Sequence, residues 1–112
     1  MVHLTITLNA TDVTAPRLAA ALRRLAGAVR LEPGFDSSAV WTTEREDDGG
    51  LLVHYEERWA NEAAVEARVR SDGFTKLLEV VERAPDDPKV EFQFVARRRG
   101  LDYVEAVRGT AR

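Results

Sequence analysis

LLVHYEERW, residues Leu51 to Trp59, is the stretch of sequence that decides the fold. It follows an Asp-Asp-Gly-Gly turn signal and precedes Asn61, a residue that often caps helices. Side chains in a strand alternate between two faces, so the odd-numbered residues share one largely apolar face. The other face carries the imidazole of His54 and the charges of Glu56 and Arg58, and it begins with Leu52. We therefore predict a central strand with a different layer packed on each side.

A strand and a helix are predicted before this stretch. Residues 2–8 are rich in β-branched side chains and alternate, which favours a first strand. Apolar residues then recur at spacings of four, three and four, as on one helical face: Leu18, Leu22, Leu25 and Val29. Thr14 is the expected cap of this helix. The helix is expected to end near Leu31, because the residue before Pro33 is disfavoured in helical conformation.

A second strand is predicted over residues 35–43. Simple alternation along it would put Phe35, Ala39 and Trp41 on one face. The acidic, glycine-rich segment 44–50 is expected to be a solvated hairpin loop. It lacks the ligand spacing of a calcium-binding loop.

Two short helices, a strand and a tail are predicted after the central strand. Asn61 is expected to cap the first helix, and Ser71 with Asp72 the second. Residues 90–96 alternate as a fourth strand. In the tail, apolar residues recur at spacing three, which suggests a short helix or a docked arm: Leu101, Val104 and Val107.

The order β-α-β-β-α-β, with the second helix split in two, predicts an α+β fold of the ferredoxin-like type with an antiparallel sheet. We expect residues 1–96 to form this domain. Residues 97–112 are then a C-terminal extension that could dock on a partner subunit.

Composition narrows the classes of function. A net charge of −3 and a pI near 5.4 argue against nucleic-acid binding, and the basic cluster 97–99 is too short to change this. The absence of cysteine excludes disulfides and thiolate chemistry. The N-terminus lacks the features of a signal peptide, and no apolar segment has the roughly 20 residues of a membrane span. A cytoplasmic protein without membrane contact is expected.

Three motifs in this order resemble the antibiotic biosynthesis monooxygenase domain family: Glu32-Pro33-Gly34-Phe35, Glu57-Arg58-Trp59 followed by Asn61-Glu62-Ala63, and Ser71-Asp72-Gly73-Phe74. The resemblance implies a protomer that dimerises through its sheet into an α+β barrel, with a pocket between sheet and helices. It also implies activities such as cofactor-independent oxidation of aromatic phenols, quinol oxidation or haem degradation.

The functional residues of that family are only partly present. Trp59 matches a tryptophan that lines the pocket in aromatic-polyketide oxygenases. Tyr55 stands where those enzymes have an amide side chain, and Val65 where they have a tyrosine. Leu78 stands where haem-degrading members have an iron-ligating histidine, so haem degradation is not expected.

Tyr55 and Glu57 are the predicted catalytic residues. Desolvation makes a carboxylate easier to protonate, which would make Glu57 a usable base. Alternatively, Glu57 forms a salt bridge with an arginine of a covering helix. Tyr55 needs a hydrogen-bond partner, either Glu57 or a ligand hydroxyl. The predicted pocket residues, which the alternative reading assigns to core packing or a turn, are Trp59, Trp41, Phe74 and Asn9.

His54, Glu56 and Arg58 are predicted to lie at the dimer interface, because they share the face opposite the pocket. An imidazole with a pKa of about 6.5 could also act in acid–base catalysis, but His54 is on the wrong face for it. The two histidines of the chain lack the spacing of a metal site. No metal or cofactor is therefore expected.

Two functions remain open at this point. One is a cofactor-independent monooxygenase that oxidises a small phenol, quinol or polyketide-like aromatic with O₂. The other is a non-catalytic, dimeric protein of the same fold that binds a small apolar ligand.

Overall fold

The computed structural model describes residues 1–95 and 101–110, without the side chains of Tyr103 and Thr110. Four antiparallel strands form one sheet in the order β2-β3-β1-β4. The strands are β1 (Val2–Ala10), β2 (Phe35–Glu44), β3 (Leu51–Trp59) and β4 (Lys89–Phe94). The helices are α1 (Thr14–Val29), α2 (Glu62–Arg70), α3 (Asp72–Val81) and α4 (Leu101–Thr110). The predicted ferredoxin-like α+β fold is confirmed.

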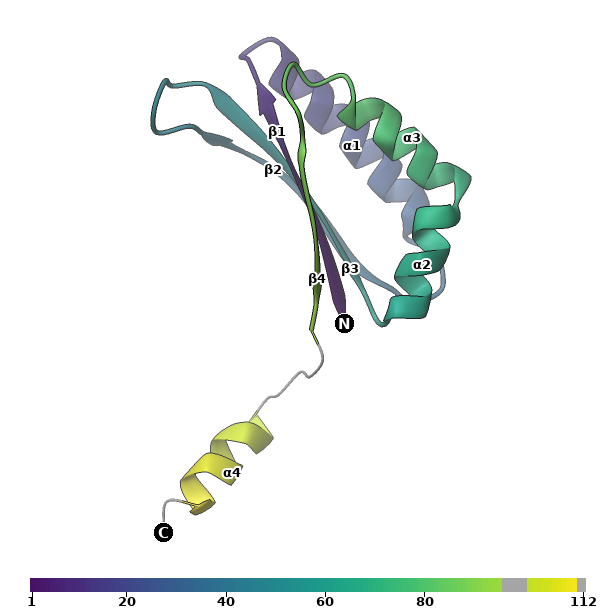
Figure 1. The fold of residues 1–112 in the computed structure, drawn as a ribbon, viewed down its shortest axis with the longest axis vertical. Coiled ribbons are helices and arrows are strands. Elements are labelled where there is room, and N and C mark those ends of the chain that lie inside the picture. The colour runs from purple at the N-terminus through teal and green to yellow at the C-terminus, as the bar shows by residue number, and fades with distance from the viewer. Residues whose placement is uncertain (96–100, 111–112) are drawn as a thin grey trace.

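Helices α1, α2 and α3 cover one face of the sheet, and Figure 1 shows α1 and α3 side by side on it. The core lies between these two layers. Alternation along β1 is strict, and its even-numbered residues are buried: Val2, Leu4, Ile6, Leu8 and Ala10. They meet the apolar stripe of α1 and the buried residues of α3, which include Phe74 and Leu77. Burial of apolar surface between the layers is thus the main stabilising contribution.

Two of the predicted helix caps are present. The side chain of Asn61 accepts a hydrogen bond from the backbone N–H of Ala64 at 2.9 Å, and that of Ser71 accepts one from Phe74 at 3.2 Å. The predicted cap by Thr14 is wrong, because the helix begins at Thr14 itself. Its hydroxyl instead accepts from the backbone N–H of Thr11 at 2.8 Å, and the Thr11 hydroxyl accepts from the Thr14 N–H at 3.1 Å.

A β-bulge in β2 changes which residues face the helices. The pairing of β2 with β3 shifts register between Phe35 and Ser37. Phe35 packs on the helix-covered side, whereas Trp41 pairs with His54 on the other side. The predicted face shared by Phe35, Ala39 and Trp41 is therefore wrong. One extra residue reverses the alternation for everything beyond it.

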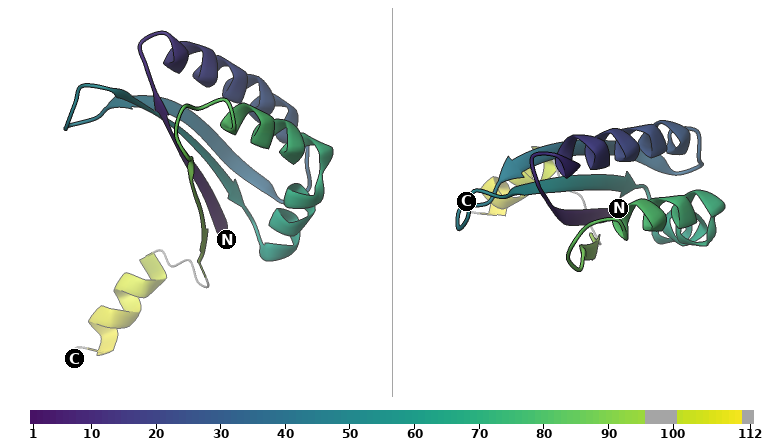
Figure 2. Two further views of the ribbon diagram at one scale, coloured as in Figure 1. Left: turned by 45° about the horizontal axis from the view of Figure 1, so that its top comes forward. Right: turned by 90° about the horizontal axis from the view of Figure 1, so that it is seen from above.

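The tail contains the predicted helix, α4. Figures 1 and 2 show it beyond the end of β4, away from the layer formed by the other helices. Its residues Leu101, Val104 and Val107 are exposed. The predicted domain boundary at 96–97 and the basic cluster 97–99 lie outside the described residues. No helix in the described part of the chain is long and apolar enough to cross a membrane.

Candidate functional site

A buried ion pair lies between the sheet and α2. The Glu57 carboxylate, on β3, accepts hydrogen bonds from Arg68 of α2, at 3.1 Å from Nε and 2.9 Å from Nη2. It also accepts from the hydroxyl of Tyr55 at 2.5 Å and from the indole Nε1 of Trp59 at 2.9 Å. All four side chains are at most 1% exposed. Three alternate residues of β3 thus converge with one helical arginine.

This arrangement confirms the salt bridge that was predicted as the alternative role of Glu57. A carboxylate has about four lone-pair sites, and four donors fill them here. Burial raises the pKa of Tyr55, and the charge and hydrogen bond of Glu57 raise it further. Burial alone would lower the pKa of Arg68, but its hydrogen bond to Glu57 and the charge of Glu57 outweigh that effect. Tyr55 therefore keeps its proton, and Arg68 keeps its charge.

The far side of the Arg68 guanidinium is packed against the start of α3. Its Nη1 has no hydrogen-bond partner among the described residues. A Cβ at Gly73 would lie 3.0 Å from this nitrogen, so a glycine leaves room for it. The guanidinium also lies over the ring of Phe74, 5.5 Å from its centroid. Phe74 is thus a core residue next to the buried cluster of Tyr55, Glu57, Trp59 and Arg68.

Trp59 has a different aromatic neighbour from the one predicted. Its ring centroid is 5.6 Å from that of Phe35, and both belong to a small apolar cluster with Val29 and Val65. Trp41 lies on the opposite face of the sheet and is 41% exposed. The predicted grouping of Trp41 with Trp59 in one pocket is therefore wrong, because the β-bulge at the start of β2 turns Trp41 away from the helices.

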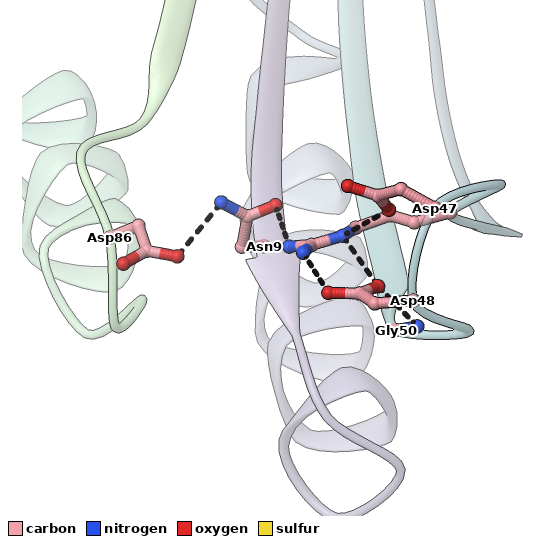
Figure 3. Close-up of polar contacts among 6 residues, drawn as sticks. Asn9, Asp47, Asp48, Gly50 and Asp86 are labelled. Atoms are coloured by element: carbon pink, nitrogen blue, oxygen red, sulfur yellow. Dashed lines mark hydrogen bonds and ion pairs between the residues drawn. The ribbon is translucent and has the colours of Figure 1, made fainter.

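Asn9 is also far from Trp59, at the other end of β1. Its amide nitrogen donates to Asp86 at 3.0 Å, and its oxygen accepts from Arg45 at 2.8 Å. Figure 3 shows these contacts and the bonds that Asp48 makes to Arg45 and to the backbone of Gly50. Asn9 and Trp59 thus do not share one site, and a substrate-binding role of Asn9 stays a prediction. The Asn9 side chain ties the β2–β3 hairpin to the loop before β4.

The sheet face opposite the helices carries the three residues predicted for the dimer interface. The His54 ring stacks on Trp41 with centroids 5.0 Å apart, and its Nε2 lies 2.7 Å from the Thr43 hydroxyl. Arg58 donates from Nε to Glu56 at 3.2 Å. Partial burial lowers the pKa of His54. We call this surface of β1, β2, β3 and β4 the open face, and its role in dimerisation stays a prediction.

A groove of about 520 Å³, open to solvent, lies between α1 and β2 beside the buried cluster of Tyr55, Glu57, Trp59 and Arg68. It is lined by Arg23, Ala26, Gly27, Arg30, Phe35, Asp36, Ser37, Ser38, Ala39 and Val40. Phe35 contacts Trp59, and Ser38 and Val40 pair across the sheet with Glu57 and Tyr55. The groove thus lies one strand away from the predicted site.

The groove was not predicted from the sequence, although the spacing of its arginines indicates it. Arg23 on α1 and Arg30 at its C-cap lie seven residues apart, outside the apolar stripe, with Gly27 between them. Such spacing puts all three on roughly one side of a helix. Which strand would face them depended on the tertiary fold.

The described residues offer no metal-binding cluster. They contain no group of three or more His, Asp or Glu side chains that could hold a metal ion. The groove supplies guanidinium, carboxylate and hydroxyl groups instead.

The strand order and the helices on one face of the sheet define an α+β protein of the ferredoxin-like class. The sequence profile of the family called antibiotic biosynthesis monooxygenase matches residues 1–80. The chain belongs to this family. A comparison with curated proteins found no match.

Solved structures agree with this assignment at the level of the fold. A candidate antibiotic biosynthesis monooxygenase from Deinococcus radiodurans has a TM-score of 0.68 at 23% identity, covering 89% of this chain and 97% of its own. One of the same description from Nitrosomonas europaea has a TM-score of 0.64 at 14% identity, covering 87% and 100%. A Pseudomonas aeruginosa protein has a TM-score of 0.60 at 22% identity, covering 86% and 94%.

Proposed function

We propose that this protein is a monooxygenase that oxidises a small phenol, quinol or polyketide-like aromatic with O₂, without a metal or organic cofactor. Membership of the family supports an oxygenase. The observation that carries the proposal is the groove between α1 and β2. Its volume of about 520 Å³ lies within the range of small-molecule sites, and its walls combine apolar and charged side chains.

The chemistry in this proposal begins with removal of a proton from an acidic C–H or O–H of the substrate. The resulting anion passes one electron to O₂, and the two radicals combine to a carbon-bound peroxide. The peroxide anion takes the proton back from the base, and at a CH₂ centre the resulting hydroperoxide loses water to leave a ketone. One oxygen atom enters the product and the other becomes water, which balances the four electrons taken from carbon.

The groove residues take the direct roles in this scheme. The guanidinium groups of Arg23 and Arg30 add positive potential to the groove in which the substrate anion forms. Asp36 is the carboxylate that lines the groove, and it accepts the proton. Phe35 and Val40 give an apolar wall for the aromatic ring.

Glu57 and Tyr55 act as positioning residues in this scheme. Their hydrogen bonds hold Trp59, against which Phe35 packs. The full set of donors on Glu57 leaves no lone-pair site for a substrate proton.

Oxygen uptake with a panel of anthrones and hydroquinones, in the presence of a metal chelator, tests the proposal. We expect uptake with at least one of them, and a rate at least about 100-fold lower in Asp36→Asn, the loss typical of a general base. Glu46→Gln, at an exposed carboxylate in the β2–β3 hairpin, is the matched control. A chain that consumes oxygen with no member of the panel contradicts the proposal.

The second candidate is a dimeric protein that binds an aromatic ligand without converting it. The saturated carboxylate of Glu57 and the bound hydroxyl of Tyr55 favour it, because both groups predicted for catalysis already have partners. Ligand binding without oxygen uptake would support this function.

A further inference from the structure

We infer that the groove between α1 and β2 selects flat aromatic molecules that carry a carboxylate or a similar anionic group. Arg23 and Arg30 would bind that group. The inference deepens the proposed function, since it names the class of substrate, but it concerns binding and can be tested without turnover.

The two arginines form a cationic rim along one side of the groove. Arg23 is on α1 and Arg30 is the residue that caps its C-terminus, so they are seven residues apart, about two helical turns or roughly 10 Å along the axis. Both side chains are exposed and line the cavity. Among the described residues, neither guanidinium is within ion-pair distance of a carboxylate. Their hydrogen-bonding capacity is therefore available to an anion.

The opposite wall is suited to a ring. Phe35 and Val40 are half-buried on β2, and Ala26 faces them as a small buried residue from the α1 side. Ser37 and Ser38 add hydroxyl groups beside the apolar wall. A planar hydrocarbon body bearing one or two polar groups matches this combination.

Gly27 keeps the helix side of the groove open. It lies on α1 between the two arginines, and a Cβ at this position would meet no atom within 4 Å. A glycine inside a helix destabilises it relative to alanine. The space above Gly27 is therefore available to a ligand, and a larger side chain there would occupy it without a clash.

Asp36 gives the bound molecule a direction. It lines the same groove but carries the opposite charge from the arginines. A ligand carboxylate would avoid Asp36 and bind the guanidinium groups, while a phenol hydroxyl could donate to Asp36. The same orientation would present the phenol to the proposed proton acceptor.

The test is isothermal titration calorimetry of the full chain with two matched probes, 6-hydroxy-2-naphthoate and 2-naphthol. We expect the carboxylate to tighten binding about tenfold, as for a charge-assisted hydrogen bond in a partly exposed site. Arg23→Gln and Arg30→Gln should each reduce the difference in affinity between the two probes. Arg24→Gln is the matched control, because Arg24 lines a different cavity, between α1 and α3.

A second pair of variants checks the location. Gly27→Leu should abolish binding of both probes, whereas Gly27→Ala should retain it. Equal affinity for the two probes, equal effects of the three arginine variants, or no binding of either probe would overturn the inference. A carboxylate preference without oxygen uptake would leave it intact and count against the oxygenase alone. Oxygen uptake without a carboxylate preference would overturn the inference and leave the proposed oxygenase intact.

Discussion

Glu57 is the residue on which the packing between the sheet and α2 depends. A buried ion pair contributes little net stability when it is compared with apolar residues of the same volume, but removing one partner leaves an uncompensated charge. Arg68 would be that charge, since it is 1% exposed and packed on three sides by Glu57, Gly73 and Phe74. Glu57 thus has a structural role that any test of catalysis must separate from chemistry.

Glu57→Gln is expected to lower the free energy of unfolding by about 3–5 kcal/mol, because it strands the buried guanidinium. Urea denaturation at fixed protein concentration measures the loss. The double variant Glu57→Leu with Arg68→Met should recover part of it, because no charge is then left in the core, while the hydroxyl of Tyr55 and the indole N–H of Trp59 lose their acceptor. A loss below about 1 kcal/mol in the single variant would argue that Arg68 reaches water.

His54 is expected to make stability depend on pH. Burial lowers its pKa below the ordinary 6.5, so the unfolded chain binds the proton more tightly than the folded one. The contribution of His54 to stability is therefore complete above pH 6.5 and is lost as the pH falls through the lowered pKa. Thermal unfolding between pH 7 and 5 should show a weaker pH dependence for His54→Gln. The same dependence in both proteins would contradict the assignment.

Local sequence predicted the face of each β3 residue correctly, because this strand is regular over its whole length. The ion pair of Glu57 followed as the expected partner of a carboxylate beneath helices that carry arginines. That the partner of Glu57 is Arg68 could not be predicted, since it depends on where α2 crosses the sheet.

At the scale of elements, the turn between α1 and β2 fixes how closely α2 approaches the sheet. Gly34 in this turn has a φ of +81°, a left-handed conformation that L side chains rarely adopt. A Cβ on it would lie 2.5 Å from the Cβ of Ala64 on α2. The glycine is required both by its backbone and by its neighbour.

Gly34→Ala is expected to lower the free energy of unfolding by at least about 2 kcal/mol, from the left-handed backbone and the forced displacement of α2. Gly49→Ala is a matched control. Its φ of +73° imposes a similar backbone penalty, but a Cβ there meets nothing within 4 Å. Thermal denaturation of both variants separates the two effects. Equal losses would show that the contact with Ala64 is easily relieved.

The elements themselves were largely predictable, because caps and periodicity act over a few residues. The bulge at the start of β2 was not. The residues Phe35, Asp36 and Ser37 include no glycine to mark it, so strict alternation was the natural expectation and misplaced Trp41. The groove also escaped prediction, since its two walls come from separate elements whose packing the sequence pattern does not specify.

At the scale of the whole molecule, the described residues give the sheet one face covered by helices and one without a helical layer (Figure 1). The open face carries Trp41 and Leu52 among polar and charged residues. We propose that a second copy of the chain packs on it, which would close the two sheets into an α+β barrel. Family membership supports this arrangement.

Light scattering should therefore give about twice the chain mass of 12.5 kDa. Trp41→Glu is expected to shift the protein to the monomer, because it puts a charge into the apolar part of the open face. Leu31→Glu is the matched control, since Leu31 is 94% exposed in the turn after α1. A wild-type mass of 12.5 kDa would contradict the dimer.

The two tryptophans of the chain lie on opposite faces of one sheet, and each has a different solvent environment. Trp59 is 1% exposed, and Trp41 is 41% exposed. The protein therefore carries two intrinsic fluorophores that report separate events. Dilution that dissociates a dimer would shift the emission of Trp41 to longer wavelength, whereas a ligand in the groove would act on Trp59 through Phe35. Emission spectra of Trp41→Phe and Trp59→Phe could thus follow assembly and ligand binding independently, without any added label.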